Sequence, residues 1–232
     1  MKHIYLLIFV ILLHANNFGT TAYMSQVGQD QYLNDHFFKN KRNGFFVDIG
    51  AYDGITHSNT YFFEKELDWK GICFEPHPRF FTKLRSIRNC LCVNACVSNH
   101  NGSEQFIAVD GGPEELSGMV STYDPRHLTR LNYEISRDGG TYTTIEVPTF
   151  TLNTILKQHD VQKIDYLSLD TEGSELEILK AIDFGAVTID FISVENNYND
   201  PAIRAYLESQ GFMYITTLSW QDEIYRYIQK KN

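Results

Sequence analysis

The chain has 232 residues, 43% of them hydrophobic, which is enough to bury the core of one sizeable α/β domain. It carries 20 basic and 29 acidic side chains, so its formal net charge is −9 at pH 7. This balance, without any run of basic residues, excludes a nucleic-acid backbone as the expected partner and favours a small or neutral substrate.

The first 22 residues differ in character from the rest. Met1-Lys2-His3 is weakly basic, and residues 4–13 form an unbroken apolar run. Ten apolar residues are too few for a membrane span of about 20, but they fit the centre of a signal peptide, with Ala15 or Ala22 at the cleavage site. We therefore predict a signal peptide or signal-anchor over residues 1–22 and a secretory-pathway or secreted protein, membrane-bound only through this segment if it is uncleaved. The alternative is a buried N-terminal strand or helix.

Residues 23–232 are predicted to form a single domain in which strands alternate with helices. The expected helices are residues 25–39, 56–67, 78–88, 152–159, 174–182 and 201–209. The expected strands are residues 45–49, 72–74, 91–97, 106–109, 164–170, 189–194, 212–218 and 224–228. This alternation predicts a doubly wound, mostly parallel sheet with an antiparallel strand at one edge.

Two segments break the alternation. Residues 110–140 hold several Gly and Pro residues with few apolar anchors, which predicts a long loop or lid. Within it, residues 117–119 are candidates for closing an acceptor pocket. Residues 142–147 resemble an edge strand that Pro148 ends.

The stretch Phe45 to Gly54 indicates a buried strand that ends in a glycine-bounded turn. Its Gly-x-x-x-Gly spacing argues against a dinucleotide pyrophosphate site, which needs Gly-x-Gly-x-x-Gly. Asp48 and Asp53 would repel a pyrophosphate, but they suit the sulfonium and ammonium groups of S-adenosylmethionine (SAM). Taken alone, the motif fits an ordinary buried strand and turn equally well.

Acidic residues follow four of the expected strands, at Asp48 to Asp53, Glu75, Asp170 to Glu172 and Glu195. In an open α/β sheet, ligands bind beyond the carboxyl ends of the strands, near the point where strand order reverses. Glu75 lies 25 residues after Gly50, close to the offset at which an acid binds ribose hydroxyls. The alternative role for Glu75 is to cap the next helix.

The cysteines are Cys73, Cys90, Cys92 and Cys96. Their spacing includes no Cys-x-x-Cys pair and gives little support to a zinc site. Three disulfide pairings and free thiols all stay open.

Several of these motifs together resemble the FkbM-type SAM-dependent methyltransferases. The resemblance covers residues 25–228, and its most specific block is Leu-Asp-Thr-Glu-Gly-Ser-Glu-Leu-Glu-Ile-Leu at 169–179. The other matching motifs are Val-Asp-Ile-Gly-Ala-Tyr-Asp-Gly at 47–54, Phe-Glu-Pro at 74–76, Ser-Gln-Val-Gly-Gln-Asp at 25–30 and Val-Glu-Asn at 194–196.

The resemblance implies a class I methyltransferase (Rossmann-like) fold that transfers a methyl group from SAM to a hydroxyl of a sugar, glycan or natural-product acceptor. The cofactor-binding residues that it suggests are Asp48, Gly50, Ala51, Tyr52, Asp53, Gly54, Glu75, Pro76, Asn94 and Ala95. This chain departs from the family pattern at Asn153 and at Tyr52-Asp53, and its leader is atypical of the bacterial members.

A sugar hydroxyl needs a base or a metal ion before it attacks a methyl group efficiently. We predict Asp170 and Glu172 as catalytic residues. Asp170, Glu195 and Asn196 also resemble the magnesium site of catechol-type O-methyltransferases, so they are candidate ligands of Mg²⁺ or Mn²⁺. The competing function is a non-catalytic secreted or membrane-associated adaptor that keeps the fold without turnover.

Overall fold

The computed structural model describes residues 23–228. The predicted leader, residues 1–22, lies outside this described part. Among residues 23–228, no helix has the length and apolar character needed to cross a membrane.

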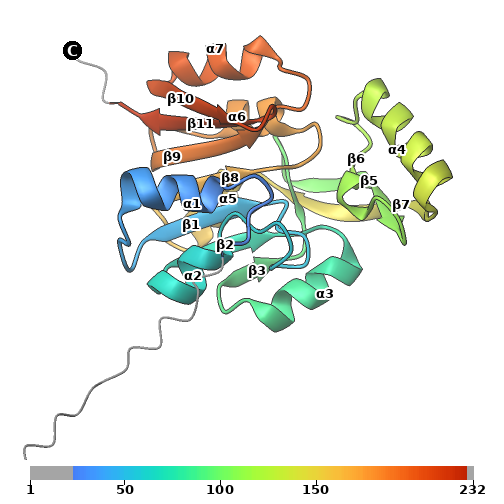
Figure 1. Cartoon of the computed structure of the whole chain (residues 1–232), viewed down its shortest axis with the longest axis horizontal. Helices are drawn as coiled ribbons and strands as arrows, with labels where there is room; N and C mark the ends of the chain where they lie inside the picture. Colours follow the sequence, from blue (N-terminus) through green and yellow to red (C-terminus); the bar gives the residue numbers. More distant parts are fainter. Residues whose placement is uncertain (1–22, 229–232) are drawn as a thin grey trace, which may run out of the picture.

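The main sheet has seven strands in the order β10-β11-β9-β8-β1-β2-β3 (Figure 1). Its strands are β1 (Phe45–Ile49), β2 (Lys70–Phe74), β3 (Leu91–Val93), β8 (Lys163–Leu169), β9 (Thr188–Glu195), β10 (Phe212–Leu218) and β11 (Asp222–Tyr227). All neighbouring strands pair in parallel except that β11 runs antiparallel to β9 and β10. The predicted doubly wound, mostly parallel sheet with an antiparallel edge is therefore confirmed, and with it the class I methyltransferase fold.

Helices cover both faces of this sheet. On one face, α5 (Leu152–Gln158), α6 (Glu175–Ala181) and α7 (Pro201–Ser209) share an apolar cluster with Val47 and Ile49 of β1. On the other, Phe46 packs with α1 (Gln29–Leu33), the π-helix η1 (Asn34–Phe38), α2 (Tyr61–Leu67) and α3 (Pro78–Ile87). The continuous apolar run of β1 follows from this burial on both faces.

A second sheet of four strands, in the order β4-β7-β5-β6, lies at one end of the main sheet (Figure 1). Its strands are β4 (Cys96–Val97), β5 (Gly102–Asp110), β6 (Gly118–Met119) and β7 (Thr141–Phe150). The connections between these strands contain the 3₁₀ turn η2 (Glu114–Leu116) and the helix α4 (Pro125–Asp138), and we count both with the second sheet. Residues 142–147 pair with β5 alone, because β4 meets β7 only at Thr149 and Phe150, so their predicted edge position is confirmed. Pro148 does not end the strand, which continues to Phe150. The expected strand 91–97 is also wrong, since it is divided between the two sheets.

The prediction of a loop over residues 110–140 is wrong as well. This segment contains α4, a helix of 14 residues that begins with Pro125 after the N-cap Asp124. His127 and Leu131 are buried one helical turn apart. The glycines that suggested a loop flank this helix rather than interrupt it.

The predicted helix over residues 56–67 starts later than expected, at Tyr61. Before it, the Asp53 carboxylate accepts hydrogen bonds from the backbone N–H groups of Ile55 and Thr56, and the Ser58 hydroxyl accepts one from Tyr61 N–H. These side-chain contacts stabilise a turn in place of a first helical turn.

All four cysteines are free thiols, which resolves the open disulfide question in the structure. The sulfurs of Cys73 and Cys90 lie 3.5 Å apart.

The order of strands reverses at β1, which continues to β2 on one side and is flanked by β8 on the other. Gly50 follows β1 with a φ of +91°, and an added Cβ would lie 1.7 Å from the carbonyl oxygen of Asp170. Only glycine permits this approach of the β1 turn to the end of β8.

We predict that Gly50→Ala destabilises the protein far more than Gly28→Ala. Gly28 has a similar φ of +89°, but among the described residues no atom lies within 4 Å of its Cβ position. Gly28→Ala should therefore cost only the left-handed strain, about 1–2 kcal/mol of unfolding free energy. The clash should add at least about 2 kcal/mol for Gly50→Ala. Urea unfolding measures both losses, and equal losses would contradict the role given to Gly50.

Candidate active site

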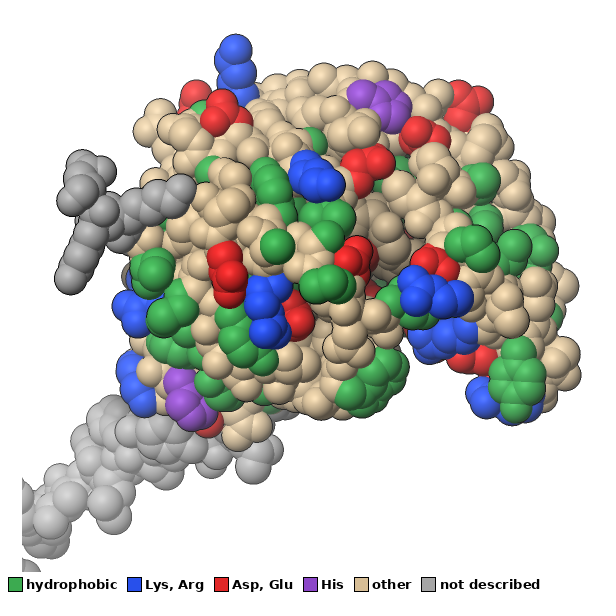
Figure 2. Space-filling view, turned by 90° about the horizontal axis from the view of Figure 1, so that it is seen from above, with side chains coloured by type: hydrophobic (Ala, Val, Ile, Leu, Met, Phe, Trp, Pro, Cys, Tyr) green, Lys and Arg blue, Asp and Glu red, His purple; other side chains and the backbone are tan. Residues whose placement is uncertain are grey.

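A cavity of about 280 Å³ lies beyond the carboxyl ends of β1, β2, β8 and β9. It is lined by residues of both sheets and of the N-terminal segment, including Gln26 and Val27. Figure 2 shows a hollow on one face of the molecule with acidic side chains at its rim. The cavity occupies the place where open α/β sheets bind ligands.

Asp48 and Glu75 both line this cavity, from the ends of β1 and β2. Asp48 is buried and accepts a hydrogen bond of 2.6 Å from the Thr60 hydroxyl. The Glu75 carboxyl accepts one of 2.7 Å from the backbone N–H of His77, and burial raises the pKa of Glu75 to about 8. Burial also raises the pKa of Asp48, although the positive charge of Arg88 acts in the opposite direction. The structure thus brings together the two acids that the sequence pattern placed in one pocket.

Further predicted cofactor-binding residues also line the cavity: Gly50, Ala51, Tyr52, Pro76 and Ala95. The Tyr52 hydroxyl donates a hydrogen bond of 2.9 Å to Glu114, which belongs to η2. The second sheet is therefore connected directly to the turn after β1.

Three residues predicted to bind the cofactor have other partners in the structure. The Asp53 carboxylate is bonded within its own turn, to Ile55 and Thr56. Gly54 lies against α3, where an added Cβ would be 2.8 Å from Leu84. The Asn94 side-chain amide donates to the carbonyl oxygens of Glu75 and Pro76 at 2.8 and 3.1 Å. Asp53, Gly54 and Asn94 thus shape the surrounding loops rather than the cavity wall.

Asp170, Glu172 and Glu195 line the cavity at the ends of β8 and β9 and form a cluster, which we call the acid trio. One carboxylate oxygen from each lies within 4.8 Å of the other two. Glu172 adopts a left-handed backbone conformation with a φ of +59°. Such a conformation is uncommon for residues other than glycine, and non-glycine examples concentrate at functional sites.

The acid trio resists ionisation. Burial is the largest cause that raises the pKa of Asp170 to about 7, and the negative charge of Asp222 is the second. Burial and the charge of Asp170 raise the pKa values of Glu172 and Glu195 well above their usual range. Three carboxyl groups this close disfavour one another's ionisation, and the positive charge of Arg130 acts in the opposite direction on the pKa of Glu172.

Neutral hydrogen-bond donors hold the trio in place. The Asn197 side-chain amide donates to Glu172 at 3.0 Å and to Glu195 at 2.7 Å. The Gln221 amide donates to the other oxygen of Glu195 at 2.9 Å. His127 Nε2 lies 3.4 Å from Glu172 Oε2 but forms no hydrogen bond with any described residue, and burial lowers the pKa of His127 to about 4, so the imidazole is neutral at pH 7.

Asn196 does not join the acid trio, contrary to the prediction from the sequence. Its side-chain oxygen accepts a hydrogen bond of 2.7 Å from the backbone N–H of Asp200, and its side-chain nitrogen donates to the Asp200 carbonyl at 3.1 Å. Asn197 contacts the trio instead. The sequence could not distinguish these adjacent asparagines, because the backbone direction after β9 decides which side chain points inward.

Several lining residues come from segments for which the sequence predicted no such role. Arg130 of α4 and Gln221 of the β10–β11 turn border the cavity. Ser117 and Met119, which were expected to close the acceptor pocket, line it as well. The spacing of four residues between His127 and Leu131 was the sequence signal that could have predicted α4. The helix in turn places Arg130.

Comparisons with known proteins agree with this geometry. A family model described as the methyltransferase FkbM domain matches residues 48–214. Methyltransferase sdnD of Sordaria araneosa is 27% identical over 196 residues, which cover 73% of this chain and 74% of that protein.

Two solved structures of low sequence identity are also similar to this chain. The methyltransferase FkbM of Methylobacillus flagellatus KT is 11% identical, with a TM-score of 0.49 over 81% of this chain and 44% of that chain. This chain thus spans less than half of that protein. Aeropyrum pernix fibrillarin, solved with natively bound S-adenosyl-L-methionine, is 12% identical, with a TM-score of 0.45 over 89% of this chain and 76% of that one.

The family match at residues 48–214 includes Asp48, Glu75 and the whole acid trio. It confirms the resemblance carried by the sequence motifs. The chain belongs to the methyltransferase FkbM domain family.

Proposed function

We propose that this protein is a SAM-dependent O-methyltransferase whose acceptor is a hydroxyl of a glycan, a sugar or another natural product. The observation that carries the proposal is the shared cavity, which has Asp48 and Glu75 on one side, after β1 and β2, and the acid trio on the other side, after β8 and β9. A methyl donor held by the first group would meet an acceptor hydroxyl held by the second.

The residues on the first side fit SAM. Glu75 stands at the end of β2, where a carboxylate can accept hydrogen bonds from both ribose hydroxyls. Gly50 and Ala95 line the cavity here, and Ala95 offers an apolar wall. The surplus of buried carboxyl groups favours a ligand with sulfonium and ammonium charges. When bound, SAM supplies an electrophilic methyl carbon.

Glu172 is the proposed general base, with Asp170 beside it. Its raised pKa makes the ionised carboxylate a stronger base toward an acceptor hydroxyl than an exposed glutamate would be. Asn197 holds this carboxyl group from the protein side, and the neutral imidazole of His127 lies beside it. Orientation of the acceptor oxygen toward the methyl carbon would supply much of the remaining rate.

A metal-dependent version of the same reaction is the second candidate. It is favoured by the acid trio, whose ligand oxygens lie within 4.8 Å of one another. Asp170, Glu172 and Glu195 would hold Mg²⁺ or Mn²⁺, which prefer carboxylate oxygen. The metal ion would favour ionisation of the acceptor hydroxyl. The bonds of Asn196 to Asp200 argue against Asn196 as a ligand in this arrangement.

From the sequence of residues 1–22 we further propose entry into the secretory pathway.

The alternative of a non-catalytic adaptor is tested by calorimetry, because an adaptor that has lost turnover has no need to bind SAM.

We expect Glu172→Gln to reduce kcat for methyl transfer by at least about 100-fold, because glutamine cannot accept the hydroxyl proton. The Kd for SAM should stay within about threefold, since Glu172 lies on the acceptor side. Radiolabelled SAM with a panel of glycans measures the rate. Glu208→Gln, the same exchange at an exposed position of α7, should leave both values unchanged. An unaltered kcat in Glu172→Gln would rule out Glu172 as the base.

Metal removal separates the two versions of the mechanism. If the trio binds a divalent ion, EDTA should reduce activity by at least about tenfold, and Mg²⁺ or Mn²⁺ should restore it. Glu195→Gln should then weaken binding of the metal ion, so that more Mg²⁺ or Mn²⁺ is needed to restore activity. Full activity in EDTA together with a harmless Glu195→Gln would exclude the metal-dependent version.

SAM binding should be coupled to the protonation of Glu75. With a pKa of about 8, Glu75 is protonated in most ligand-free molecules at pH 7. Ribose hydroxyls donate to the ionised form, so binding at pH 7 should release a proton, and affinity should rise between pH 6 and pH 8. Calorimetry in buffers of different ionisation enthalpy counts the protons. Glu75→Gln should release fewer protons and bind SAM at least about tenfold more weakly. Equal proton release by both proteins would contradict the assignment.

A further inference from the structure

Arg88 is a buried cation in contact with the loop of residues 54–60, part of which lines the cavity. Its side chain is 0% exposed, and it follows directly after α3. Its Nε donates to Glu64 at 2.6 Å, and its terminal nitrogens donate to the Gly54 carbonyl at 3.2 Å, the Ser58 hydroxyl at 3.2 Å and the Thr60 hydroxyl at 2.9 Å. A guanidinium in a dry site is retained only with partners of this number and geometry.

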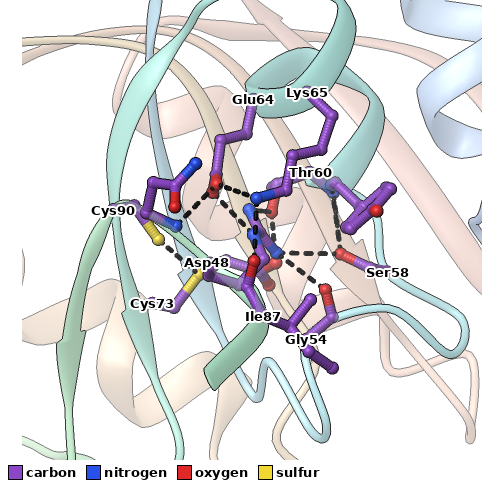
Figure 3. Close-up of polar contacts among 12 residues, drawn as sticks. Asp48, Gly54, Ser58, Thr60, Glu64, Lys65, Cys73, Ile87 and Cys90 are labelled. Carbon is purple, nitrogen blue, oxygen red and sulfur yellow. Dashed lines mark hydrogen bonds and ion pairs between the residues drawn. The ribbon is translucent and has the colours of Figure 1, made fainter. Parts of the chain in front are cut away.

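Thr60 connects this guanidinium to Asp48. The Thr60 hydroxyl accepts from Arg88 and donates its own hydrogen to Asp48 Oδ2 at 2.6 Å. A hydroxyl can do both at once, because it carries one hydrogen and two lone pairs. Figure 3 shows Asp48, Thr60, Ser58 and Gly54 converging on one centre. The position of the Asp48 carboxylate therefore depends on a chain of hydrogen bonds that begins at Arg88.

The same guanidinium ties together the loop of residues 54–60. Residues 56–59 of this loop line the cavity. Its backbone is left-handed at Gly54, with a φ of +88°, and at His57, with a φ of +56°. Arg88 contacts the loop at its start, near its middle and at its end, through Gly54, Ser58 and Thr60. One side chain thus contacts this loop at three points, in addition to the Asp53 turn and the isolated β-bridge between Ser25 and His57.

Glu64 of α2 balances and orients the cation. One Glu64 oxygen accepts from Arg88, and the other accepts from the backbone N–H of Asn89 at 2.8 Å and lies 3.0 Å from Lys65 Nζ. With Glu64 held in this way, the guanidinium can present its remaining donors only toward the loop and Thr60.

We propose that Arg88 is a positioning residue for the methyl donor, holding loop 54–60 and, through Thr60, the Asp48 carboxylate in the arrangement that binds SAM. The inference rests on the proposed function, because SAM is the ligand concerned. Arg88 itself stands behind the cavity wall and acts only through these partners.

The sharpest test removes the Thr60 hydroxyl and keeps its shape. Thr60→Val should raise the Kd for SAM at least about tenfold by calorimetry, because the link between Arg88 and Asp48 is lost and two buried polar groups lose a partner. At saturating SAM, kcat should stay within about threefold, since the acceptor side is unchanged. Thr60→Ser restores the hydroxyl and should bring the Kd back to within about threefold of the parent value.

Thr82→Val is the matched control, because it makes the same exchange on the exposed face of α3, where the hydroxyl donates to the Pro78 carbonyl of its own helix. Its Kd should equal that of the parent. Arg88→Lys tests the cation directly: lysine keeps the charge but cannot reach Glu64, Gly54 and Thr60 in a fixed fork, so SAM binding should again weaken at least about tenfold. Thermal unfolding and circular dichroism establish that each variant is folded.

The outcomes separate this inference from the proposed function. A parent protein that does not bind SAM overturns the proposed function and the inference with it. If the parent binds SAM and Thr60→Val binds it equally well, the inference alone is wrong. The inference also fails if Thr60→Val lowers kcat and thermal stability while the Kd for SAM stays constant, because the link would then be merely structural.

Discussion

The arrangement of this protein depends on the contact between Gly50 and the carbonyl of Asp170, where β1 and β8 end side by side. A side chain at position 50 would push the turn after β1 away from the end of β8. Asp48 and Glu75 belong to one side of this contact, and the acid trio begins on the other. The close approach therefore places the two carboxyl groups proposed to bind the methyl donor next to the acid trio proposed to act on the acceptor, in one cavity.

The same contact creates an electrostatic conflict. Five carboxyl groups gather in a poorly solvated cavity, and burial raises the pKa of each. The fold limits the cost with neutral donors: Thr60 for Asp48, the His77 backbone for Glu75, and Asn197 for the trio. Such a concentration of hard-to-ionise acids reduces stability and is typical of sites that handle protons or cations.

The second sheet completes the cavity rather than standing apart from it. It contributes Ser117 and Met119 to the wall, and α4 contributes Arg130. It also brings His127 to Glu172 and joins Glu114 to Tyr52. A displacement of this sheet would therefore change the surroundings of the proposed base and of the turn after β1.

The sequence by itself determined the main sheet and the identity of the principal acids, because buried parallel strands are continuous apolar runs and the turns that follow them carry their side chains to one edge. Only the tertiary structure decided the rest. It divided residues 91–97 between two sheets, formed α4 within residues 110–140 and turned Asn197 rather than Asn196 toward the trio. It also placed Arg88 behind Asp48. These features arise from contacts between segments distant in the chain, and local residue patterns do not specify which partner a side chain will meet.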